Sequence, residues 1–260
     1  MTRWAAGVEY LGTAYGGWQA QRKVKAVQAV VEAAIMRVAD HPLRVVCAGR
    51  TDSGVHAFQQ VVHFDTTARR SPYAWLLGSN SNLPPDVNLR WIQPVAEHFD
   101  ARRSAVARHY RYVIHNHRAR SALLFNRVAW WPQTLDAELM HQGAQALVGE
   151  QDFSAFRDSQ CQSSSPMRNM RHIRVARSGE FVVLDICANA FLHHMVRNIT
   201  GVLVEVGQGR QPVKWVAEVL AGRDRTKAGI NAPPGGLYFV GPEYPSEFEL
   251  PEPPQPWFPA

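Results

Sequence analysis

Cysteine is scarce in this chain of 260 residues, which has only Cys47, Cys161 and Cys187, far apart and without a Cys-x-x-Cys spacing. Three such cysteines exclude a disulfide scaffold and a zinc ribbon, and they are typical of a reduced compartment. No run approaches the roughly 20 apolar residues that a membrane span needs, so we expect no membrane partner. The first residues also lack the apolar core of a secretion signal, and we expect a cytoplasmic protein.

Several catalytic signatures are missing as well. The sequence has no Gly-x-Ser-x-Gly nucleophile elbow, no His-Glu-x-x-His zinc motif, and no Walker or Gly-x-Gly-x-x-Gly phosphate loop. His193 and His194 are adjacent in a predicted helix, where their side chains would point about 100° apart, which is unsuited to one ion. We therefore expect no metal site, no hydrolase of that kind, and a structural role for the two histidines.

Acidic residues are absent from one long stretch of a chain whose 28 basic and 22 acidic residues give a net charge of +6. Residues 101–135 hold no Asp or Glu but seven arginines, with His and Tyr among them, and a second basic stretch runs from Arg168 to Arg177. A guanidinium group binds phosphate with two donors and stacks on bases. The pattern indicates an RNA-facing surface, with an ordinary solvated surface as the alternative.

With 46% apolar residues the chain can bury a sizeable core, and the apolar spacing predicts an α+β fold. We expect two ferredoxin-like (split β-α-β) halves, each with the order β-α-β-β-α-β and an antiparallel sheet, flanking a central cleft. The expected domains are residues 1–100, residues 101–241 with the basic surface, and a Pro-rich tail at 242–260 that packs as an extended arm or stays mobile. Strands are predicted over residues 4–10, 43–47, 60–64, 88–95, 108–114, 173–177, 181–186 and 237–240, and helices over residues 27–38, 135–147 and 192–206 and from Ser71-Pro72 and Pro212.

The segment Gly49-Arg50-Thr51-Asp52-Ser53-Gly54-Val55-His56-Ala57 connects two predicted strands of the first half. An ordinary turn is one interpretation, because Asp bonds its own backbone and Gly accepts a positive φ. A functional site is the other, because loops at strand ends often carry function and a carboxylate can act as nucleophile or base. An ionised Asp52 in a cleft would need a cationic partner, and Arg197 is a candidate unless its head group simply extends to water.

The Asp52 segment closely resembles the active-site motif of the tRNA pseudouridine synthase A (TruA) family. Other motifs of that family follow in the same order and cover nearly the whole chain. They are found at residues 9–19, 60–64, 80–84, 99–102, 110–112, 161–163 and 189–198.

The resemblance implies a cofactor-free isomerase that detaches uracil from its ribose in tRNA, turns the base and rejoins it through carbon 5. Its substrate would be the anticodon stem-loop of tRNA, at positions 38, 39 and 40, and the enzyme would be a homodimer. Asp52 would be the catalytic carboxylate and Arg197 its ionic partner. Tyr110 would lie against the target uracil and serve proton transfer, and Arg50 would help the nucleotide leave the stack.

The resemblance also implies a set of residues that contact tRNA, namely Phe99, Asp100, Ala101, Arg102, Arg103, Arg118, Gln160, Cys161, Gln162, Ser163 and Ser164. The chain departs from the family pattern at Ser53, where Ala is usual, at Ser164, where Arg or Lys is expected, and at Ala26, a helix start where Ser is common. Two alternatives stay open. One is a pseudouridine synthase for another RNA or position, and the other is a catalytically inactive RNA-binding relative, which should have lost Asp52 or Tyr110.

Overall fold

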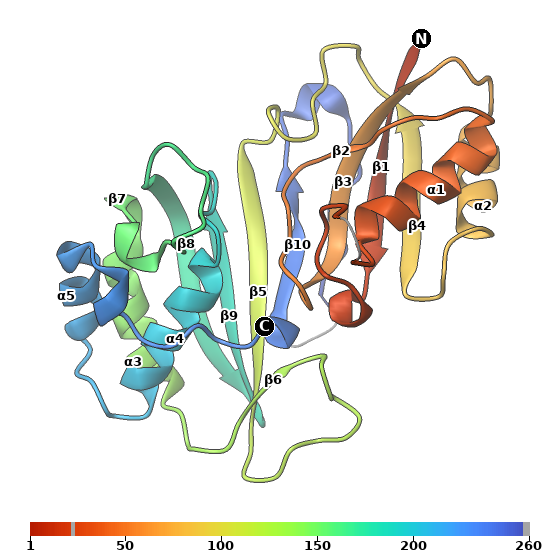
Figure 1. The fold of residues 1–260 in the computed structure, drawn as a ribbon. Coiled ribbons are helices and arrows are strands. Elements are labelled where there is room, and N and C mark those ends of the chain that lie inside the picture. The colour runs from red at the N-terminus through yellow and green to blue at the C-terminus, as the bar shows by residue number, and fades with distance from the viewer. Residues whose placement is uncertain (22–23, 257–260) are drawn as a thin grey trace. The chain divides into compact units, whose positions relative to one another are not determined.

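The computed structural model describes residues 1–21 and 24–256, and the chain folds into two compact units. Unit 1 is Met1–Val106 with Tyr238–Pro256, and unit 2 is Ala107–Leu237. In each unit helices pack against a sheet (Figure 1), so the predicted α+β fold is confirmed. The units divide the chain differently from the expected domains, because residues 101–106 and most of the last strand go with unit 1.

In unit 1, four strands pair antiparallel in the order β4-β1-β3-β2. This is the arrangement expected of a split β-α-β half. The two helices lie side by side on one face of the sheet (Figure 1), and Trp75 of α2 packs against Trp4 and Phe64. The elements are β1 (Thr2–Tyr10), α1 (Val27–Ala39), β2 (Val46–Cys47), β3 (His56–Thr66), α2 (Pro72–Asn80) and β4 (Val87–Pro94).

The strand predicted over residues 43–47 is wrong in its first part, since only Val46–Cys47 pair with β3. Glu32, a buried residue of α1, accepts the Val45 N–H at 3.1 Å and forms an ion pair with Arg44 at 3.3 Å. A side chain therefore takes the hydrogen bond that a strand would make with its neighbour, and the ladder is short.

The last strand, β10 (Leu237–Glu243), runs parallel to the start of β3 in unit 1. The chain after it packs on the same unit. Gln59 donates to the Pro251 carbonyl at 3.0 Å, and the rings of Phe248 and Phe99 meet edge to face at 5.0 Å. This part of the predicted tail is therefore a packed arm, whereas residues 257–260 lie outside the described residues.

Unit 2 has an antiparallel sheet in the order β5-β9-β8-β7, with the short β6 parallel to β5. The predicted hairpin at Ser178-Gly179 is confirmed, and Gly179 supplies the positive φ of +57° that its turn requires. The elements are β5 (Ala107–Asn116), β6 (Ala129–Trp131), α3 (Ala137–Ala144), β7 (Gly149–Asp152), β8 (Met167–Ser178), β9 (Phe181–Ala188), α4 (Met195–Gly207) and α5 (Trp215–Gly222).

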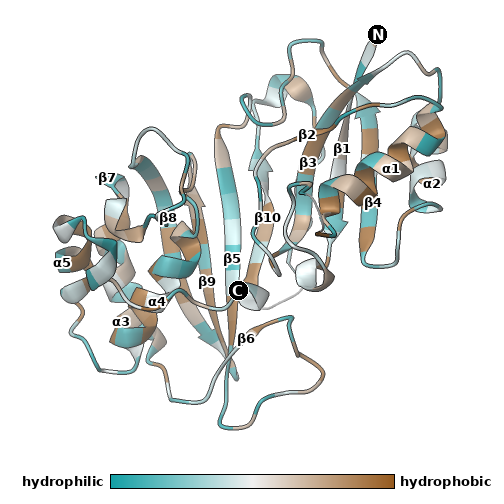
Figure 2. Ribbon diagram, in the orientation of Figure 1, coloured by the Kyte–Doolittle hydropathy of each residue, from teal (hydrophilic) through white to brown (hydrophobic). Residues whose placement is uncertain are grey.

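The first half of β5 is hydrophilic (Figure 2), yet several of its side chains are buried. Arg111 is only 7% exposed and binds both carboxylate oxygens of Asp185 on β9, at 2.8 and 3.0 Å. Tyr112 is fully buried and donates its hydroxyl to the Pro233 carbonyl at 2.6 Å. The prediction that the arginines of the acid-free stretch face RNA is therefore wrong for Arg111, whose charge is neutralised inside the sheet.

The longest helix of unit 2, α4, is buried over most of its length. It begins at Met195 rather than at the predicted residue 192, because His194 adopts a left-handed backbone with φ +61°. In the part of the chain that the structure describes, no helix combines the length and the apolar character that crossing a bilayer requires.

Candidate active site

Within the segment that connects β2 to β3, residues 49–55 form what we call the Asp52 loop. It rests on the glycine-rich segment of residues 12–18. The Trp18 N–H donates to the Thr51 carbonyl at 3.0 Å, and the Tyr15 carbonyl accepts the Gly54 N–H at 3.3 Å. The loop is therefore attached to the amino-terminal segment on both sides of Asp52.

Two glycines of the amino-terminal segment allow this close approach. A Cβ on Gly12 would lie 1.9 Å from the Val55 carbonyl oxygen, and a Cβ on Gly17 would lie 2.6 Å from that of Thr51. Gly17 also has a φ of +94°, which side-chain-bearing residues rarely adopt. Both positions belong to the family motif at residues 9–19, and the structure gives the physical reason for glycine there.

Buried hydrogen bonds hold the two ends of the loop. The Tyr10 hydroxyl and the Thr51 Oγ1 lie 2.7 Å apart in the interior of unit 1. At the other end, His56 Nδ1 accepts the Gly12 N–H at 2.9 Å, and His56 is buried. These contacts leave the loop little freedom to shift along the sheet.

Asp52 is the first residue of a turn in this loop and is half-buried, between the buried Thr51 and the exposed Ser53. The Asp52 carbonyl accepts the Val55 N–H at 3.2 Å, and Gly54 takes a φ of +78°, so a tight turn follows the carboxylate. The turn interpretation of the segment is therefore confirmed, and the functional interpretation of Asp52 stays a prediction. The hydroxyl of Ser53 donates to the Tyr15 carbonyl at 3.2 Å, a bond that the usual Ala cannot make.

Tyr15 in turn is held by the remainder of unit 1. Its hydroxyl donates to Asp86 at 2.6 Å, and the Lys25 ammonium lies 4.6 Å from the centre of its ring. Burial and then this hydrogen bond raise the pKa of Tyr15 well above its usual value, so the phenol stays protonated. The residue is therefore a support for the loop.

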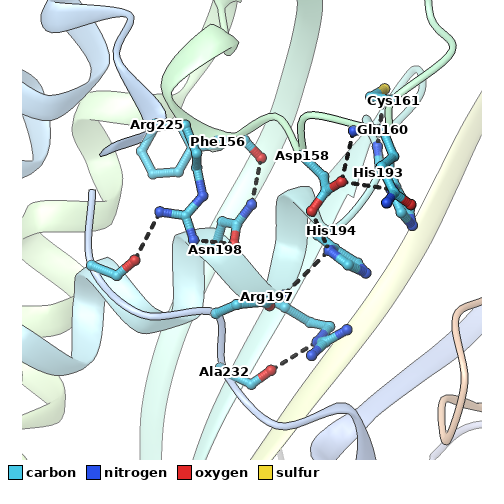
Figure 3. A network of polar contacts seen from close by, with 12 residues as sticks. Phe156, Asp158, Gln160, Cys161, His193, His194, Arg197, Asn198, Arg225 and Ala232 are labelled. Carbon is cyan, nitrogen blue, oxygen red and sulfur yellow. Dashed lines mark hydrogen bonds and ion pairs between the residues drawn. The ribbon is translucent and has the colours of Figure 1, made fainter. Parts of the chain in front are cut away.

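Unit 2 contains the other two residues expected at the site, Tyr110 and Arg197. Tyr110 lies on β5 opposite Ile186 of β9, is 9% exposed, and meets the Phe191 ring edge to face at 5.0 Å. Arg197 lies in the first turn of α4 and is half-buried. Its Nε donates to the Ala232 carbonyl at 2.7 Å (Figure 3), which orients the guanidinium plane.

The prediction that His193 and His194 point away from each other is wrong. His194 precedes α4 with its left-handed backbone, so the two rings stack with centroids 3.9 Å apart. Both Nδ1 atoms face Asp158, at 3.4 Å for His193 and 2.9 Å for His194 (Figure 3). Partial burial opposes ionisation of Asp158, but hydrogen bonds from the Gln160 N–H and His194 outweigh it and lower the pKa of this carboxyl.

The expected RNA-binding residues fall into buried and exposed groups. Phe99 and Ala101 are fully buried, so the expectation that they contact tRNA is wrong for their side chains. Asp100, between them, accepts the N–H groups of Arg102 and Arg103, both at 2.9 Å. Phe99 and Ala101 therefore anchor the segment in the interior, and Arg102 and Arg103 are exposed at the surface.

The expected RNA-binding loop of residues 160–164 lies beside the histidine pair. Cys161 is half-buried, and its Sγ accepts the His193 N–H at 3.4 Å. The Arg157 guanidinium donates to the carbonyls of Cys161 and Ser163 at 2.8 and 2.7 Å, which stabilises the loop from inside. The side chains left exposed are Gln160, Gln162 and Ser164.

Sequence reasoning missed the residues that support the candidate site. Asp158, Asn198 and Arg225 were not singled out, although Figure 3 shows them in one polar network with Arg197. Their partners are up to 42 residues away in sequence, so no local spacing indicates them. A buried Asn within an apolar helix, such as Asn198, was the one available indication, since a buried amide needs partners.

Comparison with known proteins decides the family. A family model described as tRNA pseudouridine synthase matches residues 6–102 and 144–245. The chain belongs to the tRNA pseudouridine synthase family. In this family match, Asp52, Arg50 and Arg197 lie within the matched residues, whereas Tyr110 and Arg118 lie between the two matched segments.

Curated members of the tRNA pseudouridine synthase family are similar over nearly the full chain. The tRNA pseudouridine synthase A of Aeromonas hydrophila subsp. hydrophila is 59% identical over 97% of this chain and 94% of its own length. Those of Aeromonas salmonicida and Cronobacter sakazakii are 58% and 56% identical, each over 96% of this chain and 93% of their own length. A solved archaeal box H/ACA sRNP Nop10–Cbf5 complex aligns with 12% identity over 90% of this chain and 46% of that one, and its TM-score of 0.34 is too low to support a conclusion.

Proposed function

We propose that this protein isomerises uridine to pseudouridine in the anticodon stem-loop of tRNA, at positions 38, 39 and 40. The observation that carries the proposal is the Asp52 loop, in which a half-buried carboxylate follows a backbone that is bonded to residues 12–18. The family match and the names of the relatives support the reaction and the substrate class. The reaction is an internal exchange of bonds without oxidation or reduction, so we propose that it uses no cofactor.

In the proposed reaction the bond from N1 of uracil to C1′ of ribose breaks, the base turns, and a bond from C5 to C1′ forms. The proton on C5 is lost and N1 gains one, so the nucleotide keeps its composition. Asp52 is the proposed catalytic carboxylate, which can attack the sugar, attack the base or remove a sugar proton. All three routes give pseudouridine and use the Asp52 carboxylate.

The remaining roles follow the family resemblance. Tyr110 would contact the uracil and transfer a proton, and Arg197 would pair with Asp52 and keep the carboxylate ionised. Arg50 is exposed and next but one to Asp52 in the loop, where it can assist extrusion of the target nucleotide. Arg197 suits an ion pair because its Nε bond to Ala232 already orients the guanidinium plane.

The proposed tRNA-binding surface uses exposed cationic and polar side chains. Arg102 and Arg103 are exposed above the Asp100 turn, and Gln160, Gln162 and Ser164 are exposed in the loop of unit 2. Arg118 lines a surface cavity of about 410 Å³ together with His117 and Arg177. Arginines in such places can bind backbone phosphates, which fix the orientation of the RNA.

We also propose that the enzyme works in the cytoplasm as a homodimer. Support for the dimer comes from the family resemblance, and support for the compartment from the three dispersed cysteines. Sedimentation at micromolar concentration should give a mass of twice 29.2 kDa. A fully active monomer would contradict this part of the proposal.

Asp52→Asn tests the catalytic assignment. The substitution keeps the size of the side chain but removes its charge and most of its nucleophilicity, so single-turnover formation of pseudouridine should vanish. Affinity for tRNA in a gel-shift assay should stay equal or rise slightly, because a carboxylate repels phosphate. Arg50→Ala is the matched comparison and should lower binding and turnover together.

Three outcomes would change the proposal. Substantial product from folded Asp52→Asn would remove Asp52 from the catalytic role. Product at other uridines, mapped in tRNA with and without the protein, would change the assigned positions. Tight tRNA binding without any product from the unmodified protein would instead support an RNA-binding relative without catalysis.

A further inference from the structure

The orientation of Arg197 depends on a segment distant in sequence. Besides the bond from Arg197 Nε, the Ala232 N–H donates to the Arg197 carbonyl at 3.2 Å. Two hydrogen bonds in opposite directions therefore connect residue 197 of α4 to residue 232. Any shift of residues 228–232, which we call the clasp segment, would turn the guanidinium of Arg197.

The clasp segment lies directly against the backbone of α4. A Cβ on Gly201 would lie 1.7 Å from the Ile230 carbonyl oxygen, and a Cβ on Gly229 would lie 3.0 Å from that of Gly201. Glycine at both positions allows main chain to pack on main chain. The segment has no intervening side chain that could absorb a displacement, so its own anchors decide where Ala232 lies.

Arg225 supplies such an anchor. Its Nη1 donates to the carbonyls of Ala228 and Gly229, at 3.3 and 2.9 Å, and its Nη2 donates to Asn198 Oδ1 at 2.9 Å (Figure 3). Asn198 is 1% exposed, and its Nδ2 donates to the Phe156 carbonyl at 2.9 Å. One guanidinium therefore connects the clasp segment to the residue that follows Arg197 in the helix.

We propose that Arg225 is a positioning residue for Arg197. It fixes the clasp segment on α4, the clasp segment holds Arg197 Nε, and the guanidinium is thereby oriented toward its catalytic task. Charge-assisted hydrogen bonds from a planar group are the type that fixes such geometry, and a lysine cannot reproduce both edges of the fork. This inference rests on the proposed function of Arg197.

The test compares Arg225→Ala and Arg225→Lys with Arg223→Ala as the matched control. Arg223 lies two residues earlier and pairs with Asp152 at 3.2 Å, outside this network. Arg225→Ala should lower kcat for pseudouridine formation by about tenfold or more with KM for tRNA within twofold, since only the orientation of a catalytic group changes. Arg225→Lys should lie between Arg225→Ala and the unmodified protein, and Arg223→Ala should be unchanged.

Measuring Arg225→Ala in a second protein, the Arg197→Lys variant, distinguishes a positioning role of Arg225 from a purely structural one. In Arg197→Lys protein, where the fork is already lost, adding Arg225→Ala should change the single-turnover rate by less than twofold. An equal loss in both backgrounds, or a kcat equal to that of Arg223→Ala in folded protein, would overturn the inference. If Arg225→Ala does not fold, Arg225→Lys carries the same comparison. Absence of product from the unmodified protein would instead refute the proposed function itself.

Discussion

Gly17→Ala tests whether the backbone contact beneath Asp52 sets the rate of the reaction. Gly17 has a φ of +94°, and a Cβ there would lie 2.6 Å from the Thr51 carbonyl oxygen and 3.1 Å from the Asp52 carbonyl carbon. Ordinary van der Waals contact begins at 3.4 Å, so the Asp52 loop would have to move by about 0.8 Å, the difference from 2.6 Å. A displacement of that size at a reacting group can cost about 100-fold in kcat.

The matched control is Gly149→Ala. Gly149 has a φ of +95°, nearly the same, but a Cβ there would meet nothing within 4 Å. Both variants should lose about 1–2 kcal/mol of folding free energy from the left-handed backbone. Only Gly17→Ala should lose kcat, measured by single-turnover pseudouridine formation at a temperature where both variants are folded. Equal rates for the two folded variants would refute the reasoning that the Gly17 contact places the carboxylate.

Three further predictions concern stability and binding. Ala26→Ser should stabilise unit 1 by about 1 kcal/mol, because Ala26 is the extended N-cap residue of α1 and a serine hydroxyl there can accept the Ala29 N–H, which no side chain now caps. An unchanged melting temperature would contradict this prediction. Asp158→Asn should destabilise the fold at neutral pH, because the lowered pKa of Asp158 adds stability that is complete above the unfolded value of about 4 and is lost as the pH falls through the folded value. The difference in denaturation midpoint between the two proteins should therefore shrink steadily as the pH falls below about 4, and a difference that does not shrink with falling pH would refute this prediction. Arg102→Ala should weaken tRNA binding and reduce the slope of log affinity against log salt concentration by about one unit. The control is Lys214→Ala, since Lys214 pairs with Glu218, and equal slopes for the two variants would show that Arg102 does not bind RNA.

Local patterns predicted the elements of the fold well where the element itself contains the signal. Ser71 caps α2 and accepts the Ala74 N–H at 3.2 Å ahead of Pro72, as the Ser-Pro pair predicts. The failures have tertiary causes. Residues 43–45 read as a strand, but Glu32 from α1 takes the Val45 N–H, and the left-handed backbone of His194 delays the start of α4. Neither cause is visible in a window of neighbouring residues.

The candidate site was predictable for side chains that carry charge or chemistry, and less so for their neighbours. Asp52 and Arg197 are singled out because a carboxylate or a guanidinium in an unusual context favours a functional interpretation, whereas Arg50 enters through the family resemblance, and the three roles stay predictions. The family resemblance also included Phe99 and Ala101, which are buried beneath the exposed Arg102 and Arg103. A contiguous motif identifies a segment, but in an irregular segment it does not tell which side chains reach the surface.

The contacts that hold the Asp52 loop and Arg197 were not predicted from the sequence, because their acceptors are backbone carbonyls. Both sides of the Asp52 loop are held through the carbonyls of Tyr15 and Thr51, and Arg197 is held through that of Ala232. Every residue has a carbonyl, so side-chain type gives no indication of which ones serve as acceptors. The indication lies in the glycines instead, because Gly12, Gly17 and Gly201 lie where another stretch of backbone approaches too closely for a Cβ. A glycine in a segment that packs on such a loop, or within a buried helix, is therefore the residue type from which this support could be predicted.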